Sequence, residues 1–552
     1  MFFDLIPVHA AKLGAAFLVL ISALWFRYTT RRDTFVVQEK RDDARGAPST
    51  FPYIFPLLGS LPLAYLWDPK AFVLNPANFF QSARPVRVKI LTQEFYAVCG
   101  PENVKALFRK SWECTSIPFV QFAMGHAFGV SPQVLNLYGK DDSGCGPTPH
   151  AGSTVEARNR VDYRDHQSII QFLEGKGLSP LWNRFAEDIA QKLHSLYDRA
   201  TLDWSYHADF MKVIGDDATV SVLNALCGPH LLRLNPTFPD DYWVFDRNLQ
   251  TYLQGIPWFL APRAYAARKR VLDSFKLWQQ YARDHFEELS IGADGDDPYW
   301  GSSFFRKRQG MFLEMDGHNY ADISSQDFGL IWAARNSVTA TCWVIYEIFR
   351  DPELLASVRA EVDACALTDA DGHIQFNIDQ LLRLPILQAV YAEVLRLRMD
   401  FYLVRMPDRV DMNIQNWIIP RRKAIIALTT VAHMDSKSWN TGIHNEHPVD
   451  QFWIGRFLKY PPDSGPPTFS TKGSDGSWIP YGGGPRQCPG RHLAKRQILL
   501  HTALMVSFFD CEILEGGKNV QGDSTLKGFG SGVAHPAGKV PVKIRRRDRG
   551  SP

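Results

Sequence analysis

The chain has 552 residues, 45% of them hydrophobic, so it is long enough to build a large buried core. Its formal net charge of +3 is too small to indicate a nucleic-acid partner, and its eight cysteines include no Cys-x-x-Cys pair. The cysteine spacing argues against a disulfide scaffold and against a clustered zinc site, and it fits a reducing compartment.

The N-terminal region contains an uncharged apolar run at residues 13–26. Extended back to residue 5, the run reaches the roughly 20 residues that a bilayer-spanning helix needs. Arg27, Arg31 and Arg32 follow the run, which places the rest of the chain on the cytoplasmic side by the positive-inside rule. We predict a single-pass membrane anchor with its basic flank at residues 1–32; a short buried helix is the alternative.

The next segment, residues 33–66, is rich in proline, with Pro48, Pro52, Pro56 and Pro62. Proline fixes φ and removes a hydrogen-bond donor, so this segment cannot form a regular helix. We interpret it as a stiff hinge that holds the catalytic domain, residues 67–552, against the membrane. An ordinary surface loop is the alternative.

The body of the chain shows mainly helical periodicity. Apolar residues recur at helical spacing in residues 180–197, 324–350, 378–398 and 491–509. Short strands are predicted at residues 410–420, 423–430 and 538–547, and a long polar loop at residues 139–158. Long helices with a small, late β portion predict a predominantly α fold of the α+β class.

A glycine-rich loop carries an isolated cysteine, Cys488, just before the last predicted helix. Gly482–Gly484 precede Cys488 and Gly490 follows it, although a free cysteine is most often a buried structural residue. Glycines let the backbone approach a bulky ligand, and a helix N-terminus with nearby cations favours the thiolate. The loop therefore predicts either a nucleophile or a soft metal ligand. A cysteine-dependent phosphatase is excluded because Ala494 stands where its arginine would be.

The loop resembles the haem-binding signature of cytochrome P-450 enzymes, Phe-Gly-x-Gly-x-Arg-x-Cys-x-Gly, with Tyr481 in place of the phenylalanine. The matching residues are Gly482, Gly484, Arg486, Cys488 and Gly490. The resemblance implies that Cys488 is the thiolate ligand of the iron of haem b. An anionic sulfur ligand pushes electron density onto the iron and so favours O–O cleavage. It also implies that Arg486 pairs with a haem propionate, that Gly484 belongs to the cofactor-binding loop, and that Gly490 lets the next helix approach the porphyrin.

Upstream residues extend the resemblance. Glu393 and Arg396, three residues apart on one helix face, match the Glu-x-x-Arg motif of the family, and Arg456 resembles the third member of its Glu-Arg-Arg cluster. Arg405 matches a position that often contacts the second propionate; a plain surface arginine is the alternative.

The central helix departs from the family pattern Ala-Gly-x-Asp/Glu-Thr-Thr. Arg335 replaces the acid, Asn336 the first threonine and Ser337 the second. An asparagine here is similar to the branch that includes the sterol 7α-hydroxylases and prostacyclin synthase. We expect Asn336 and Ser337 to be catalytic residues, Asn336 positioning water and Ser337 acting as a hydroxyl relay. The orientation of Arg335, beside the iron or away from it, stays open.

The resemblance implies a monooxygenase anchored in the endoplasmic reticulum membrane. It would oxidise a lipophilic, terpenoid or steroid-like small molecule in a biosynthetic pathway. No dinucleotide fingerprint is present, so electrons would come from NADPH through a separate flavoprotein, NADPH-cytochrome P-450 reductase. Arg491, Lys495 and Arg496 either present a basic surface to that donor or solvate one helix face. The alternatives are a haem-thiolate isomerase or dehydratase that uses no dioxygen and a haem sensor without turnover.

Overall fold

The fold is known from a computed structural model. It describes residues 14–24, 46–51, 65, 67–75, 84–90, 93–369, 373–462 and 465–548. Residues 14–24 of the predicted anchor are helical and mostly exposed. No helix in the described ranges combines the length and the apolar character needed to cross a bilayer. The rest of the predicted anchor, and most of the predicted hinge at residues 33–66, lie outside the described residues.

Most of the body is helical. The helices are α3 (Pro69–Leu74), α4 (Pro101–Arg109), α5 (Ile117–Ala123), α6 (Pro132–Lys140), α7 (Val161–Leu173), α8 (Leu178–Arg199), α9 (Phe210–Cys227), α10 (His230–Leu234), α11 (Phe238–Arg247), α12 (Leu249–Leu253), α13 (Pro262–His285), α14 (Ser303–Leu313), α15 (Tyr320–Ala333), α16 (Arg335–Arg350), α17 (Pro352–Asp363), α18 (Ile378–Leu381), α19 (Pro385–Arg398), α20 (Thr429–His433) and α21 (Arg491–Phe508).

The strands are short by comparison. They are β1 (Val86–Ile90), β2 (Gln93–Ala97), β3 (Cys114–Thr115), β4 (Ser205–His207), β5 (Ala366–Thr368), β6 (Ile374–Phe376), β7 (Met399–Pro407), β8 (Met412–Ile414), β9 (Trp417–Ile419), β10 (Ala424–Leu428), β11 (Leu458–Lys459), β12 (Thr468–Phe469), β13 (Phe509–Ile513), β14 (Ser531–Val533) and β15 (Val542–Arg546).

The core is built around α16, which packs against α9, α19 and α21. Nearly every side chain of α16 is buried, including Trp343 and Tyr346 at 0% exposure. Apolar side chains such as these on most faces of a helix favour a place inside the protein, and the buried polar residues Arg335 and Glu347 have ion-pair partners there. The C-terminal helix α21 also packs on α8, so the helix that begins beside Cys488 is anchored deep in the core.

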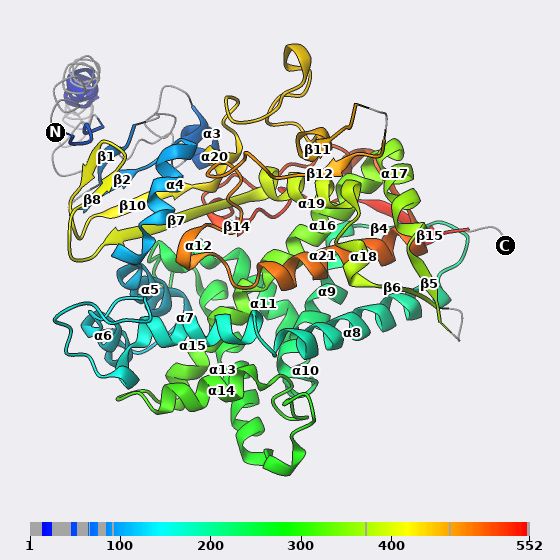
Figure 1. Ribbon diagram of the computed structural model, residues 1–552, viewed down its shortest axis with the longest axis horizontal. Helices are drawn as coiled ribbons and strands as arrows, with labels where there is room; N and C mark the ends of the chain where they lie inside the picture. Colours follow the sequence, from blue (N-terminus) through cyan, green and yellow to red (C-terminus); the bar gives the residue numbers. More distant parts are fainter. Residues whose placement is uncertain are drawn as a thin grey trace, which may run out of the picture.

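The largest sheet has the strand order β1-β2-β10-β7-β14, with β3 also paired to β7. In Figure 1 this sheet lies at the upper left, and helices fill most of the rest of the molecule. Its pairs are antiparallel except β10 with β2, and Ser531 of β14 faces Phe401 of β7 in register. The sheet thereby brings residues 531–533 beside the strand that carries Arg405.

The predominantly α fold of the α+β class is confirmed, with two local differences. The predicted β portion is not only late, because β1 and β2 open the largest sheet. The central helix predicted at residues 324–350 is broken at Ala334 into α15 and α16. At the break the Ala334 and Ser337 amides donate to carbonyls three residues back, and the Ser337 hydroxyl donates to the Ala334 carbonyl oxygen at 3.0 Å. Such side-chain competition for backbone groups bends helices.

Candidate active site

The cysteine loop has a backbone conformation that requires its glycines. Gly482 and Gly484 both have a φ of 67°, a left-handed conformation that favours glycine. A Cβ atom on Gly484 would also lie only 2.4 Å from the carbonyl oxygen of Phe108 in α4. The Cys488 amide donates to the Tyr481 carbonyl oxygen at 3.0 Å, which closes the loop just before α21. The glycines thus serve to place Cys488.

Cys488 is the only one of the eight cysteines, all of which lie among the described residues, whose side chain is exposed. Burial nevertheless raises the pKa of its thiol, and the backbone amides of Gly490 and Arg491 and the Arg491 cation only partly oppose this effect. The thiol is therefore accessible at its surface while much of its surroundings is protein. The helix N-terminus stabilises the thiolate, as predicted, but the opposing effect of burial on the thiol pKa is larger. A bound cation would be needed to hold the sulfur deprotonated.

Arg405 and Arg486 converge near the cysteine loop. Arg405 is 6% exposed, and its Nε has no hydrogen-bond partner among the described residues, while its Nη1 donates only to the Val404 carbonyl oxygen. Burial and the nearby Arg486 lower the pKa of the Arg405 guanidinium to about 10. No carboxylate of the described chain pairs with Arg405. A buried cation without a counter-ion is costly, so this place fits an anionic ligand.

Arg486 has a protein partner that no local sequence pattern predicts. Its Nη1 lies 3.1 Å from Asp162 Oδ1, its Nη2 lies 2.5 Å from Oδ2, and its Nε has no partner in the described structure. Asp162 raises the pKa of Arg486 despite burial. His166, one turn further along α7, hydrogen-bonds the Pro485 carbonyl oxygen at 3.0 Å. Helix α7 therefore clamps the cysteine loop through two polar side chains.

Glu393, Arg396 and Arg456 form the predicted cluster, which the structure confirms. Arg396 donates to both oxygens of Glu393, at 2.7 and 2.8 Å, and Arg456 Nε donates to Glu393 Oε1 at 3.1 Å. All three side chains are 0% exposed. Arg396 and Arg456 also donate to the carbonyl oxygens of His433 and Pro448. The cluster ties α19 to the segment that follows β10.

The three predicted residues of the central helix point in different directions. Arg335 is fully buried and forms an ion pair with Asp246 of α11 at 3.1 Å, so its side chain is directed toward α11 and β14. Asn336 is half-buried; its Oδ1 accepts from the Val533 amide at 2.9 Å and its Nδ2 donates to the Ala333 carbonyl oxygen at 3.1 Å. Ser337 is buried, whereas Ala333 is exposed although its neighbours are packed in the core.

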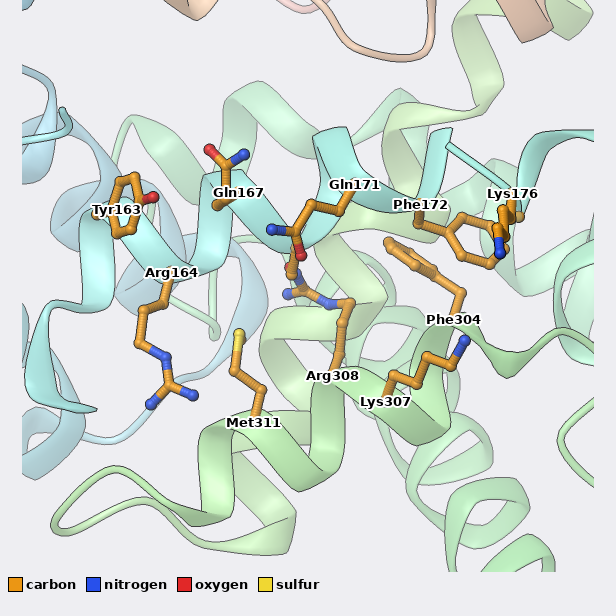
Figure 2. A pocket seen from close by; sticks show the side chains of 12 residues that line it. Tyr163, Arg164, Gln167, Gln171, Phe172, Lys176, Phe304, Lys307, Arg308 and Met311 are labelled. Atoms are coloured by element: carbon orange, nitrogen blue, oxygen red, sulfur yellow. The ribbon is translucent and has the colours of Figure 1, made fainter. Parts of the chain in front are cut away.

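A separate groove of about 510 Å³ lies between α7 and α14, and none of the predicted site residues lines it. Phe172 and Phe304 pack against one another in this groove, with ring centroids 4.7 Å apart and ring planes tilted by 36° (Figure 2). Arg308, also in the groove, is 2% exposed and pairs with Asp165 and Asp327 at 2.8 Å each. This buried ion pair joins α14 to α7 and α15.

The residues around Cys488 fit a haem. The accessible thiol would supply a soft ligand for the iron, and the unbalanced cation of Arg405 would pair with a carboxylate of the haem. The unpartnered Nε atoms of Arg405 and Arg486 leave donors for such groups. A Cβ atom on Gly490 would make an ordinary contact of 3.8 Å with Cys488 Sγ, so the protein's own packing does not require glycine at this position.

Comparison with known proteins agrees with this geometry. The cytochrome P450 family profile matches residues 256–539. The chain is 32% identical to the cytochrome P450 monooxygenase fsoE of Humicola fuscoatra over 91% of this chain and 88% of the relative. It is 30% identical to the cytochrome P450 monooxygenase efuG of Hormonema carpetanum over 98% of both chains. It is 23% identical to the 25-hydroxycholesterol 7-alpha-hydroxylase of Rattus norvegicus over 62% of this chain and 80% of the relative. The chain therefore belongs to the cytochrome P450 family of haem-thiolate monooxygenases.

Proposed function

We propose that this monooxygenase inserts one oxygen atom into a lipophilic, terpenoid or steroid-like molecule as a step of a biosynthetic pathway. The observation that carries the site assignment is the accessible thiol of Cys488 beside the unbalanced cation of Arg405. The similarity to a rat hydroxylase of 25-hydroxycholesterol supports a steroid-like substrate, as does an asparagine at position 336.

In this proposal Cys488 binds the iron of haem b, and Arg405 and Arg486 bind its propionates. When bound, the haem supplies the redox chemistry at iron that activates dioxygen. The clamp from Asp162 and His166 would hold the cysteine loop in place, while the cluster around Glu393 ties α19 to the segment that follows β10. Gly484 and Gly490 keep the backbone close to the cofactor.

On the distal side, Asn336 would orient water. A primary amide has two N–H donors and two acceptor lone pairs, and Asn336 uses one of each within the protein. One donor and one acceptor remain for a solvent molecule. Ser337, whose hydroxyl donates to the Ala334 carbonyl oxygen, retains lone pairs that would accept a hydrogen bond from a neighbouring water.

The organisation of the chain follows from the same proposal. Residues 1–32 would anchor the protein in the endoplasmic reticulum membrane, residues 33–66 would act as a hinge, and residues 67–552 would form the cytoplasmic catalytic domain. Electrons would come from NADPH through NADPH-cytochrome P-450 reductase. Deleting residues 1–32 should move the protein from the membrane pellet to the supernatant on cell fractionation; an unchanged distribution would refute the anchor.

The first test is a carbon monoxide difference spectrum of dithionite-reduced membranes, with Cys488→Ser as the control. A strongly red-shifted Soret band that disappears in the variant is expected. An unshifted band in the unaltered, folded protein would refute the assignment of Cys488. Oxygen and NADPH consumption with candidate terpenoids and steroids, in the presence of reductase, then tests the monooxygenase reaction.

A second candidate, a haem-thiolate isomerase or dehydratase, is supported by the absence of an acid at position 335. There the described chain has a guanidinium that turns toward α11. This alternative predicts substrate conversion without oxygen or NADPH consumption.

A further inference from the structure

A buried charge cluster joins three separate elements of the distal side. Asp246 of α11 pairs with Arg335 Nε at 3.1 Å and hydrogen-bonds His535 Nε2 at 2.5 Å, and it accepts from Trp332 Nε1 at 2.7 Å. Arg335 Nη1 donates to the Val533 carbonyl oxygen at 2.9 Å. These contacts connect α11, the break between α15 and α16, and the end of β14.

The cluster is placed where two backbones approach closely. Arg335 Nη2 also donates to the Ser531 carbonyl oxygen at 2.6 Å, so the guanidinium bonds both ends of β14. Between them, Gly532 has a φ of 126°, and a Cβ atom on it would lie 2.2 Å from Asn336 Oδ1 and 2.9 Å from Arg335 Nη2. The strand thus lies directly on the side chains of Arg335 and Asn336. The contacts of Arg335, together with the Asn336 Oδ1 bond to the Val533 amide, hold β14 against the helix break.

The position of β14 bears on the distal surface of the site. β14 pairs with β7, in which Arg405 lies four residues after Phe401, the partner of Ser531. The same helix break that bonds β14 exposes Ala333. The contacts of β7, β14 and the helix break therefore connect the strand that carries Arg405 with the exposed turn of the central helix.

Stabilisation alone does not account for such a cluster. Arg335 is 0% and Asp246 4% exposed, and buried ion pairs often contribute little net stability because the desolvation cost offsets the attraction. Their directional bonds do, however, fix one arrangement of the elements that they join. A guanidinium that donates to two carbonyl oxygens in different directions and pairs with a carboxylate is suited to that role.

We propose that Asp246, Arg335 and His535 form a positioning unit that sets the spacing between β14 and the break of the central helix, and thereby limits the size of the molecules accepted on the distal side. This inference rests on the proposed haem site. It makes Arg335 a specificity-determining residue that acts through β14 and not through contact with iron.

The test uses the full-length holoenzyme and two azoles that bind haem iron from the distal side. Imidazole is small, whereas clotrimazole carries three aryl rings and must contact the distal wall. Spectral titration of the Soret band gives a dissociation constant for each. In Arg335→Lys, which keeps the charge but not the two directed bonds to the carbonyl oxygens of β14, we expect the ratio of the two constants to change ~10-fold or more, equivalent to about 1.4 kcal/mol, with imidazole binding nearly unchanged.

Arg308→Lys is the matched control, because Arg308 is an equally buried arginine with two carboxylate partners in a different part of the helical body. In this control, the ratio of the dissociation constants for clotrimazole and imidazole should remain that of the unaltered protein. An unchanged ratio in Arg335→Lys, or the same change in Arg308→Lys, would overturn the inference. If Arg335→Lys does not fold, His535→Gln, at the partly exposed end of the cluster, decides by the same ratio. Failure of the unaltered protein to bind imidazole would instead refute the proposed haem site.

Discussion

Replacing Arg405 with methionine tests the proposed propionate contact, because it should change the stability of the haem-free protein and the affinity for haem in opposite directions. Burial and Arg486 lower the pKa of the Arg405 guanidinium to about 10, well below the usual value for arginine. At about 1.4 kcal/mol for each tenfold change in a proton equilibrium, the fold disfavours this charge by roughly 3 kcal/mol. Methionine fills a similar volume without the charge. Arg405→Met should therefore stabilise the haem-free protein by about 1–3 kcal/mol.

The same substitution should have the opposite effect once haem is bound. An anion that offsets a cost of roughly 3 kcal/mol would contribute up to about 100-fold to haem affinity. We expect Arg405→Met to release haem to excess apomyoglobin on the order of 10 to 100 times faster than the unaltered protein. The control is Arg409→Met, which removes a partly exposed arginine that pairs with Asp142. An unchanged release rate in Arg405→Met, or lower stability of its haem-free form, would refute the reasoning.

Four further substitutions give distinct outcomes. Glu393→Gln should lower the free energy of unfolding in urea by about 3–5 kcal/mol, since it leaves two buried guanidiniums without their carboxylate; a loss below ~1 kcal/mol would contradict this. Burial lowers the pKa of His501 to about 3, so the unfolded chain takes up its proton first and stability is lost as pH falls from about 6.5 to about 3. His501→Leu should make urea unfolding less pH-dependent in that window by up to about 1.4 kcal/mol per pH unit, and an identical slope would count against it. Gly532→Ala should lower the melting temperature through a clash of about 1–3 kcal/mol with Asn336 and Arg335, whereas a native-like melting curve would show that β14 can shift freely. Asn336→Ala should uncouple NADPH consumption from product formation, measured by the product-to-NADPH ratio; an unchanged ratio would remove Asn336 from the proposed proton path.

Local sequence patterns predicted the parts of the site that lie within one segment. The glycine spacing around Cys488 reflects backbone positions with φ near 67°, and the spacing of Glu393 and Arg396 places both on one face of α19. Such constraints act between residues a few positions apart, so a single sequence reveals them. The predominantly helical fold followed in the same way from apolar periodicity.

The missed features depend on residues far apart in the chain. Asp162 meets Arg486 across 324 positions, and nothing around Asp162 distinguishes it from an ordinary acidic residue at the start of a helix. The orientation of Arg335 depends on Asp246, which precedes it in the chain, and on β14, whose residue Val533 follows it by 198 positions. Only tertiary packing brings such partners together.

The contrast between Cys488 and the other seven cysteines has a practical consequence. Six of the seven are buried and Cys365 is partly exposed; since burial raises the pKa of all eight thiols, it is exposure that distinguishes Cys488. A thiol reagent applied to native protein would therefore react first at Cys488, and only in molecules whose sulfur is not bound to iron. The fraction of Cys488 that is alkylated, measured by peptide mass spectrometry, would therefore equal the haem-free fraction of a preparation.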